Sequence, residues 1–114
     1  MEATAEQKSF RFAIRIVNLY KYLRKEKKEF VLSKQMLRSG TSIGANIAES
    51  QQAQSRADFL AKLNIALKEA AETDYWLRLL HATDYMSDAE FYSVHDDCTE
   101  LEKMLTAIIK STKK

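Results

Sequence analysis

The sequence predicts an all-α protein, an antiparallel up-down-up-down four-helix bundle that forms a single domain over residues 1–114. Two observations predict this class. The chain has no proline and only two glycines, whereas β-sandwiches, barrels and loop-rich domains need many of both in their turns. Hydrophobic residues make up 46% of the chain, and they recur at helical rather than alternating spacing.

The first helix is expected from about Glu6 to Lys28, and the second from an N-cap at Ser33 to near Gln52. The apolar face of the first helix contains Phe12, Ile16, Leu19, Tyr20 and Leu23, and Phe10, Ile14 and Val17 widen it. Gly40 and Gly44 share the apolar face of the second helix. Each glycine costs about 1 kcal/mol relative to alanine inside a helix, so we expect a neighbouring helix to approach closely there.

The third helix is expected to begin after an N-cap at Ser55 and to end near Thr83, and the fourth begins with a capping box of Ser87 and Glu90. Both helices show heptad spacing. The apolar heptad stripe, or seam, of the third helix contains Phe59, Leu63, Ala66, Ala70, Thr73, Leu77 and Leu80. The seam of the fourth helix contains Phe91, Val94, Cys98, Leu101, Leu105, Ile108 and Thr112. The short connections make consecutive helices antiparallel neighbours.

Two helices carry more apolar surface than one bundle needs. The first is apolar over more than half of its circumference, and the third has a second stripe beside its seam. This second stripe contains Leu60, Leu67, Ala71 and Tyr75, with Trp76 also to be placed. Surplus apolar stripes predict contact with a partner, and we expect that partner to be another copy of the chain.

Charge is distributed unevenly along the chain. Residues 1–57 carry a net charge of +6 and residues 58–114 carry −4. The positive half predicts contact with RNA or DNA through the first helix, because phosphate binding needs Lys and Arg on one surface. The candidate contact residues are Lys8, Arg11, Arg15, Lys21, Arg24 and Lys25. The alternative is a protein-interaction scaffold, in which the basic half of one copy meets the acidic half of the next.

The polar face of the second helix is the other candidate site. It contains Arg38, Ser42, Asn46 and Glu49. Arg38 and Glu49 are too far apart to pair within the helix, so partners are expected on other helices or subunits. The candidates are Glu69, Glu72 and Asp74 for Arg38, and Arg11 or Arg15 for Glu49. A simple solvated face remains equally consistent with the pattern.

Catalytic, cofactor and metal sites are not expected. The two histidines, His81 and His95, offer a zinc site only weakly with Asp84, Asp88 or Cys98. The single cysteine, Cys98, lies in an apolar seam, as a small buried thiol would, and it suits a reducing compartment. The chain shows neither a signal peptide nor an apolar run long enough to cross a membrane. A cytoplasmic protein without membrane contact is therefore expected.

Several stretches resemble the four-helix-bundle family encoded by intervening sequences in bacterial 23S rRNA genes. They are residues 35–50 (QMLRSGTSIGANIAES), Asp58-Phe59, residues 65–77 (IALKEAAETDYWL) and residues 100–105 (ELEKML). The resemblance implies a cytoplasmic bacterial bundle that assembles as a ring, with a pentamer as the expected copy number. It also implies a relative, the accessory variability protein of diversity-generating retroelements. That relative looks like a basic barrel that binds nucleic acid and a reverse transcriptase. No catalytic residue is carried over, and the resemblance gives Arg38, Ser42, Asn46 and Glu49 a structural or interfacial role.

Overall fold

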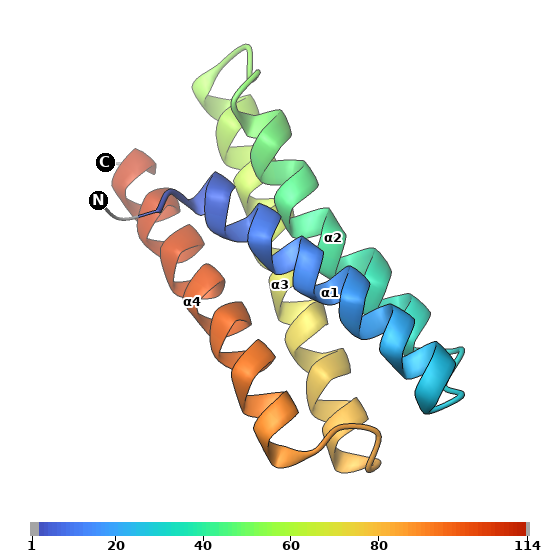
Figure 1. The fold of residues 1–114 in the computed structure, drawn as a ribbon. Coiled ribbons are helices and arrows are strands. Elements are labelled where there is room, and N and C mark those ends of the chain that lie inside the picture. The colour runs from blue at the N-terminus through green and yellow to red at the C-terminus, as the bar shows by residue number, and fades with distance from the viewer. Residues whose placement is uncertain (1–2, 114) are drawn as a thin grey trace.

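The computed structural model describes residues 3–113 and shows four helices connected in an antiparallel bundle (Figure 1). They are α1 (Ala5–Glu26), α2 (Leu32–Ser50), α3 (Arg56–Ala82) and α4 (Asp88–Lys113). Each helix packs against its two neighbours in the order α1, α2, α3, α4 and back to α1. The resulting rod measures 45 × 23 × 22 Å, and the predicted fold class is confirmed. Within the described residues, no helix is both long and apolar enough to traverse a bilayer.

The two glycines place α1 and α2 in close contact, as the sequence predicted. A Cβ atom added to Gly40 would lie 2.9 Å from Cγ2 of Ile16, a fully buried residue of α1. A Cβ atom on Gly44 would lie 3.3 Å from the backbone oxygen of Ser9. A side chain at Gly40 would force the buried Ile16 or α1 to move, and one at Gly44 would require α1 to give by a few tenths of an ångström. The loss of helix propensity at both glycines is therefore offset by packing between the two helices.

The predicted seams form the core of the bundle, with one difference at the end of α4. In α3 the seam residues from Leu63 to Leu80 are buried, while Phe59 is half-buried. In α4 the prediction holds as far as Leu105, but Ile109 is buried in place of Ile108. A straight helix has 3.6 residues per turn rather than 3.5, so a heptad stripe drifts around it. By the last turns of α4, this drift has moved the core position by one residue.

The prediction of surplus apolar surface is right for α1 and right in part for α3. Phe10 and Ile14 of α1 are 68% and 49% exposed. In α3, by contrast, Leu60, Leu67 and Trp76 pack against the core of the same chain. Ala71 and Tyr75 of the same predicted stripe are exposed, Tyr75 at 50%.

Two of the predicted helix caps are confirmed and one is wrong. The hydroxyl of Ser55 accepts a hydrogen bond from the backbone of Asp58, and Ser87 and Glu90 form the reciprocal capping box. Ser33 is not the N-cap of α2; it lies in the first turn, where its hydroxyl donates to the backbone oxygen of Glu29. The side chain that satisfies the first amides of α2 belongs to Glu29.

The Glu29 carboxylate bridges the connection between α1 and α2. It accepts hydrogen bonds from the backbone N–H groups of Val31, Leu32 and Ser33, at 3.1, 2.8 and 2.6 Å. Burial by itself raises the pKa of Glu29, but these three amide hydrogen bonds outweigh it and hold the pKa below its ordinary value. The negative charge also lies at the positive end of the helix dipole. Glu29 is thus a buried N-terminal cap for α2 that lies two residues before the N-cap position.

Replacing Glu29 with glutamine should destabilise the fold by about 1 kcal/mol at neutral pH, because a neutral amide accepts fewer and weaker hydrogen bonds from these amides. A lowered folded-state pKa stabilises the protein above the ordinary carboxyl pKa, and this stabilisation is lost as the pH falls through the folded value. Urea unfolding of wild type and E29Q across that range should therefore show the two stabilities converging in acid. Glu26→Gln, at an exposed position nearby, is the control; an equal loss there would contradict the capping role.

Candidate functional site

The basic residues that the sequence assigned to one nucleic-acid surface fall into two groups. Lys8 and Arg15, in the first half of α1, face acidic residues of α4. Lys8 forms an ion pair with Glu100. The Arg15 guanidinium lies 2.6 Å from the carboxylate of Asp97 and also donates to the hydroxyl of Ser93. These two cations hold α1 against α4, and their charge is largely neutralised within the chain.

The second group lies where α1 ends and α2 begins. Lys21, Arg24 and Lys25 are exposed, and over residues 3–113 no carboxylate forms an ion pair with any of them. The short connection adds two more exposed lysines at this end of the bundle, and the first turn of α2 adds a third. Together they form the tip cluster, which consists of Lys21, Arg24, Lys25, Lys27, Lys28 and Lys34. Lys34 was missing from the sequence prediction because only the turn brings the first turn of α2 next to α1.

Arg11 belongs to neither group. It is exposed and lines a groove of about 930 Å³ between α1 and α2, together with Phe10, Ala13 and the small residues of the outer face of α2. Among the described residues it forms no ion pair. The six residues predicted as a single surface therefore lie in three separate places: the ion pairs with α4, the tip cluster, and the groove between α1 and α2.

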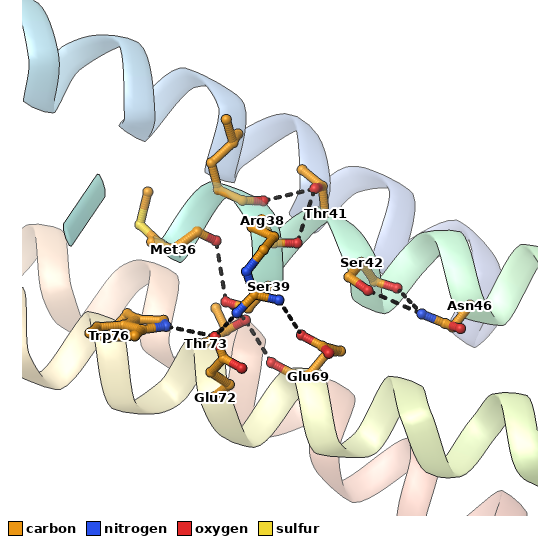
Figure 2. A network of polar contacts seen from close by, with 11 residues as sticks. Met36, Arg38, Ser39, Thr41, Ser42, Asn46, Glu69, Glu72, Thr73 and Trp76 are labelled. Atoms are coloured by element: carbon orange, nitrogen blue, oxygen red, sulfur yellow. Dashed lines mark hydrogen bonds and ion pairs between the residues drawn. The ribbon is translucent and has the colours of Figure 1, made fainter. Parts of the chain in front are cut away.

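The polar face of α2 makes contacts within the chain (Figure 2). The Arg38 guanidinium pairs with two carboxylates of α3, Glu72 and, at 3.5 Å, Glu69, as predicted. The indole N–H of Trp76 donates to the same Glu72 carboxylate at 3.0 Å. The third candidate, Asp74, lies elsewhere, on the side of α3 that faces α4. The Arg38 contacts therefore tie α2 to α3 and fix their register.

The other three motif residues depart from the prediction in part. Glu49 pairs with Lys62 of α3 at 3.2 Å, not with Arg11 or Arg15, because α1 contacts the opposite flank of α2. The amide of Asn46 donates to the backbone oxygen and hydroxyl of Ser42, at 2.9 and 3.1 Å. These two side chains therefore contact each other along α2, as Figure 2 shows.

A buried hydroxyl pair between α2 and α3 was not anticipated from the sequence. The Thr73 hydroxyl lies 2.9 Å from that of Ser39, and both residues are fully buried. Their hydroxyls also contact the backbone oxygens of Glu69 and Met36 in the preceding turns. The signal available in the sequence was Thr73 itself, a polar residue at a seam position that requires a hydrogen-bond partner.

The two histidines lie at the interface of α3 and α4, but they do not form a metal site. His81 of α3 lies 2.7 Å from Asp88, and His95 of α4 lies 2.7 Å from Asp74. The ring of Phe91 stacks against both imidazoles, with centroid distances of 4.2 and 4.7 Å. Over the described part of the chain, no three His, Cys, Asp or Glu side chains are placed to hold a metal ion.

Cys98 has the properties of a structural thiol. It is fully buried, and its Sγ donates to the backbone oxygen of Ala70 at 3.4 Å. Burial raises the pKa of this thiol far above its ordinary value, and the nearby charge of Glu102 raises it further. A reactive cysteine needs the opposite environment, one that favours the thiolate. The geometry around Cys98 thus gives no support to a cysteine nucleophile.

Comparisons with known proteins agree with this arrangement. The family model described as 23S rRNA-intervening sequence protein matches residues 1–107. The chain belongs to this family. A crystal structure of a protein with unknown function from the S23 ribosomal protein family of Bacteroides thetaiotaomicron VPI-5482 is 63% identical, with a TM-score of 0.93. The alignment covers 94% of this chain and 99% of that one. No curated protein matches this chain.

Membership of the 23S rRNA-intervening sequence protein family confirms the resemblance carried by the helix-two motif and the α3 stretch. The residues of the α2 motif, residues 35–50, make the contacts described above. Gly40 and Gly44 permit the close approach of α1, and Arg38 pairs with carboxylates of α3. The most distinctive residues in the sequence thus hold three helices together.

Glu102 is the carboxylate in this family member whose surroundings oppose its charge. It lies on α4 beside Cys98 and Asp74. Burial raises the pKa of Glu102, and repulsion from the Asp74 carboxylate raises it further, while His95 partly counteracts both. A carboxyl group whose pKa is raised on folding binds protons more tightly in the native state, so the native state loses stability as the pH rises through the folded value.

Replacing Glu102 with glutamine should therefore stabilise the bundle by about 0.5 kcal/mol at neutral pH, the size of a relieved like-charge contact. The amide keeps an oxygen for the Cys98 thiol and gains a donor for Asp74. Thermal unfolding at several pH values should show that the gain disappears in acid, where the wild-type carboxyl group is protonated. Asp96→Asn, at an exposed position of α4, is the control. A loss of stability in E102Q at neutral pH would contradict this assignment.

Proposed function

We propose that this chain is a non-enzymatic protein that assembles with copies of itself through the outer face of α1. The observation that carries the proposal is the exposure of Phe10 and Ile14, at 68% and 49%, beside the groove between α1 and α2. Large apolar side chains that are clustered and exposed mark interaction surfaces. A second copy is the partner that always accompanies the chain at equal concentration.

The shape of this groove suits a helix. Its α2 wall consists of Thr41, Gly44, Ala45 and Ala48, and small residues permit helix axes to approach closely. If the face of α1 on one copy contacts a different face on the next, the contact is heterologous, and repeated contacts form a ring when the rotation between copies closes. A ring of five copies is the assembly that the family resemblance implies.

Charge pairing between copies contributes less than the sequence suggested. Lys8, Arg15 and Arg38 in the basic half already pair with carboxylates in the acidic half of the same chain. Apolar contact is therefore the main source of affinity in the proposed assembly. A protein-interaction scaffold remains the alternative role, with a reverse transcriptase as the partner that the resemblance implies.

Nucleic-acid contact is the second candidate function, and it is favoured by the tip cluster. Six exposed cations lie at one end of the bundle, outside the ion pairs that neutralise Lys8 and Arg15. In a ring, the tip clusters of several copies would act together, and multivalency would raise the affinity for a long polyanion. Phosphate contacts are thus assigned to Lys21, Arg24 and Lys25 rather than to the whole length of α1.

Replacing Phe10 and Ile14 together with glutamine should dissociate the assembly without unfolding the bundle. Both side chains are largely exposed, and glutamine is compatible with a helix. In sedimentation velocity, wild type should have a multiple of the 13.1 kDa chain mass, and the double variant should sediment as a single chain. Tyr92→Gln, an exposed aromatic position on α4, is the control. A folded wild-type protein that stays single at high concentration would refute the proposal.

Nucleic-acid affinity should fall steeply with salt, because bound phosphates release counterions. In filter binding, Lys21→Gln with Lys25→Gln should weaken binding and reduce the salt slope by about two, about one for each lost phosphate contact. The matched double variant Lys8→Gln with Arg15→Gln removes the same charge from the paired half of α1 and should retain most of the affinity. Affinity that is insensitive to salt would exclude phosphate contacts.

A further inference from the structure

The turn between α1 and α2 combines the tip cluster with an exposed aromatic ring. Residues 20–34 carry a net charge of +4, twice the +2 of the whole chain. Of the two carboxylates in this segment, that of Glu29 is buried against the amides of α2. The surface of the turn is therefore strongly cationic and complementary to a polyanion.

Two neighbouring apolar residues project from this cationic turn. Phe30 is 52% exposed and Val31 is 71% exposed. Neither belongs to the core or packs against it. A ligand that covers these two residues has to match both an aromatic ring and positive charge.

The ring of Phe30 is held in place by its neighbours. The Arg24 guanidinium lies 5.5 Å from the Phe30 ring centroid and 5.3 Å from that of Tyr20, and it donates a hydrogen bond to the Tyr20 hydroxyl. The backbone on the other side of Phe30 is fixed by the Glu29 cap and by Lys28, whose φ of 55° turns the chain at the end of α1. A preordered ring loses little entropy when a ligand stacks on it.

We propose that this turn is a binding site for single-stranded nucleic acid, in which one unpaired base stacks on Phe30 and the tip cluster holds the flanking phosphates. The proposal rests on the nucleic-acid contact proposed above and specifies its ligand. Aromatic rings that project from a basic surface are the usual platforms for single strands. A duplex is a poor ligand for this ring, because its base faces are covered by stacking.

The position of Arg24 favours a base over a lipid bilayer. Inserting Phe30 and Val31 among acyl chains would carry the Arg24 guanidinium, which lies over the Phe30 ring, out of water. Burying a charged group without a partner is costly. A stacked base, by contrast, leaves the guanidinium in the solvated interface, where it can contact a phosphate.

The test measures fluorescence anisotropy of the full chain with three labelled probes of equal length: oligothymidine, the same backbone without bases, and a duplex. Wild type should bind oligothymidine most tightly. Phe30→Ala should weaken oligothymidine binding about 5- to 150-fold, the range for losing one stacked base, and leave the abasic strand unchanged. Phe30→Trp should restore binding. Val31→Ala, the adjacent exposed apolar residue, is the matched control and should bind like wild type.

Three other outcomes would overturn the proposal. If Phe30→Ala binds oligothymidine as well as wild type does, phosphate contact stands but stacking is refuted. If wild type binds none of the probes at low salt, the nucleic-acid contact itself fails, and this inference fails with it. If Phe30→Ala and Val31→Ala both abolish binding to phosphatidylserine vesicles while oligothymidine binding is unaffected, the turn is a lipid-binding loop.

Discussion

The close approach of α1 and α2 at Gly40 and Gly44 is the constraint on which the rest of the structure depends. Ile16 occupies the space that a side chain at Gly40 would take, and Ser9 of α1 leaves no more than a van der Waals gap at Gly44. With the two helices this close, α1 cannot bury its whole apolar circumference between α2 and α4. Phe10 and Ile14 are consequently left outside, and the proposed assembly surface follows directly from the tight packing beneath it.

Ion pairs within the chain lie along the length of the bundle, whereas the cations at the turn between α1 and α2 lie outside these pairs. Along the rod, the cations Lys8, Arg15 and Arg38 of α1 and α2 meet carboxylates of α3 and α4. The Glu49 carboxylate of α2 pairs in the opposite sense, with Lys62 of α3. Such half-exposed pairs add little stability, but they penalise wrong registers. At the turn between α1 and α2, the Glu29 carboxylate is used to cap a helix. Among the described residues, the surrounding lysines form no ion pair.

The interface of α3 and α4 is built differently. Instead of close helix packing, it contains a Phe91 ring between two imidazoles, each beside a carboxylate of the other helix. Glu102 and Cys98 continue this polar strip towards the end of α4. The concentration of titratable groups resembles an active site in composition, but burial raises the pKa of the Cys98 thiol, and within residues 3–113 no three side chains are placed to hold a metal ion. Its role is to orient α4 against α3.

Local and periodic features were determined by the sequence alone. The four helices, the heptad seams of α3 and α4, the caps at Ser55 and Ser87 and the close approach at Gly40 all depend on residues within a few turns of one another, or on composition. Glu69 and Glu72 were among the partners that the sequence offered for Arg38, but the sequence left a solvated face equally consistent, and the structure decided between the two. The family motif could be recognised in the sequence, and its residues Arg38, Gly40 and Gly44 make the contacts between helices.

Only the tertiary structure decided which residues pair with one another. Residue spacing along a helix leaves several pairing partners equally possible. Lys8 and Lys21 lie on the same helix, yet the first is paired and the second is free, because acidic residues of α4 face only one of them. Glu29 rather than Ser33 caps α2, since the turn folds a side chain back over the helix end. Leu60 and Leu67 are partly buried against the core, whereas Tyr75 of the same predicted stripe is exposed. Each outcome depends on the relative placement of helices, which no single helix encodes.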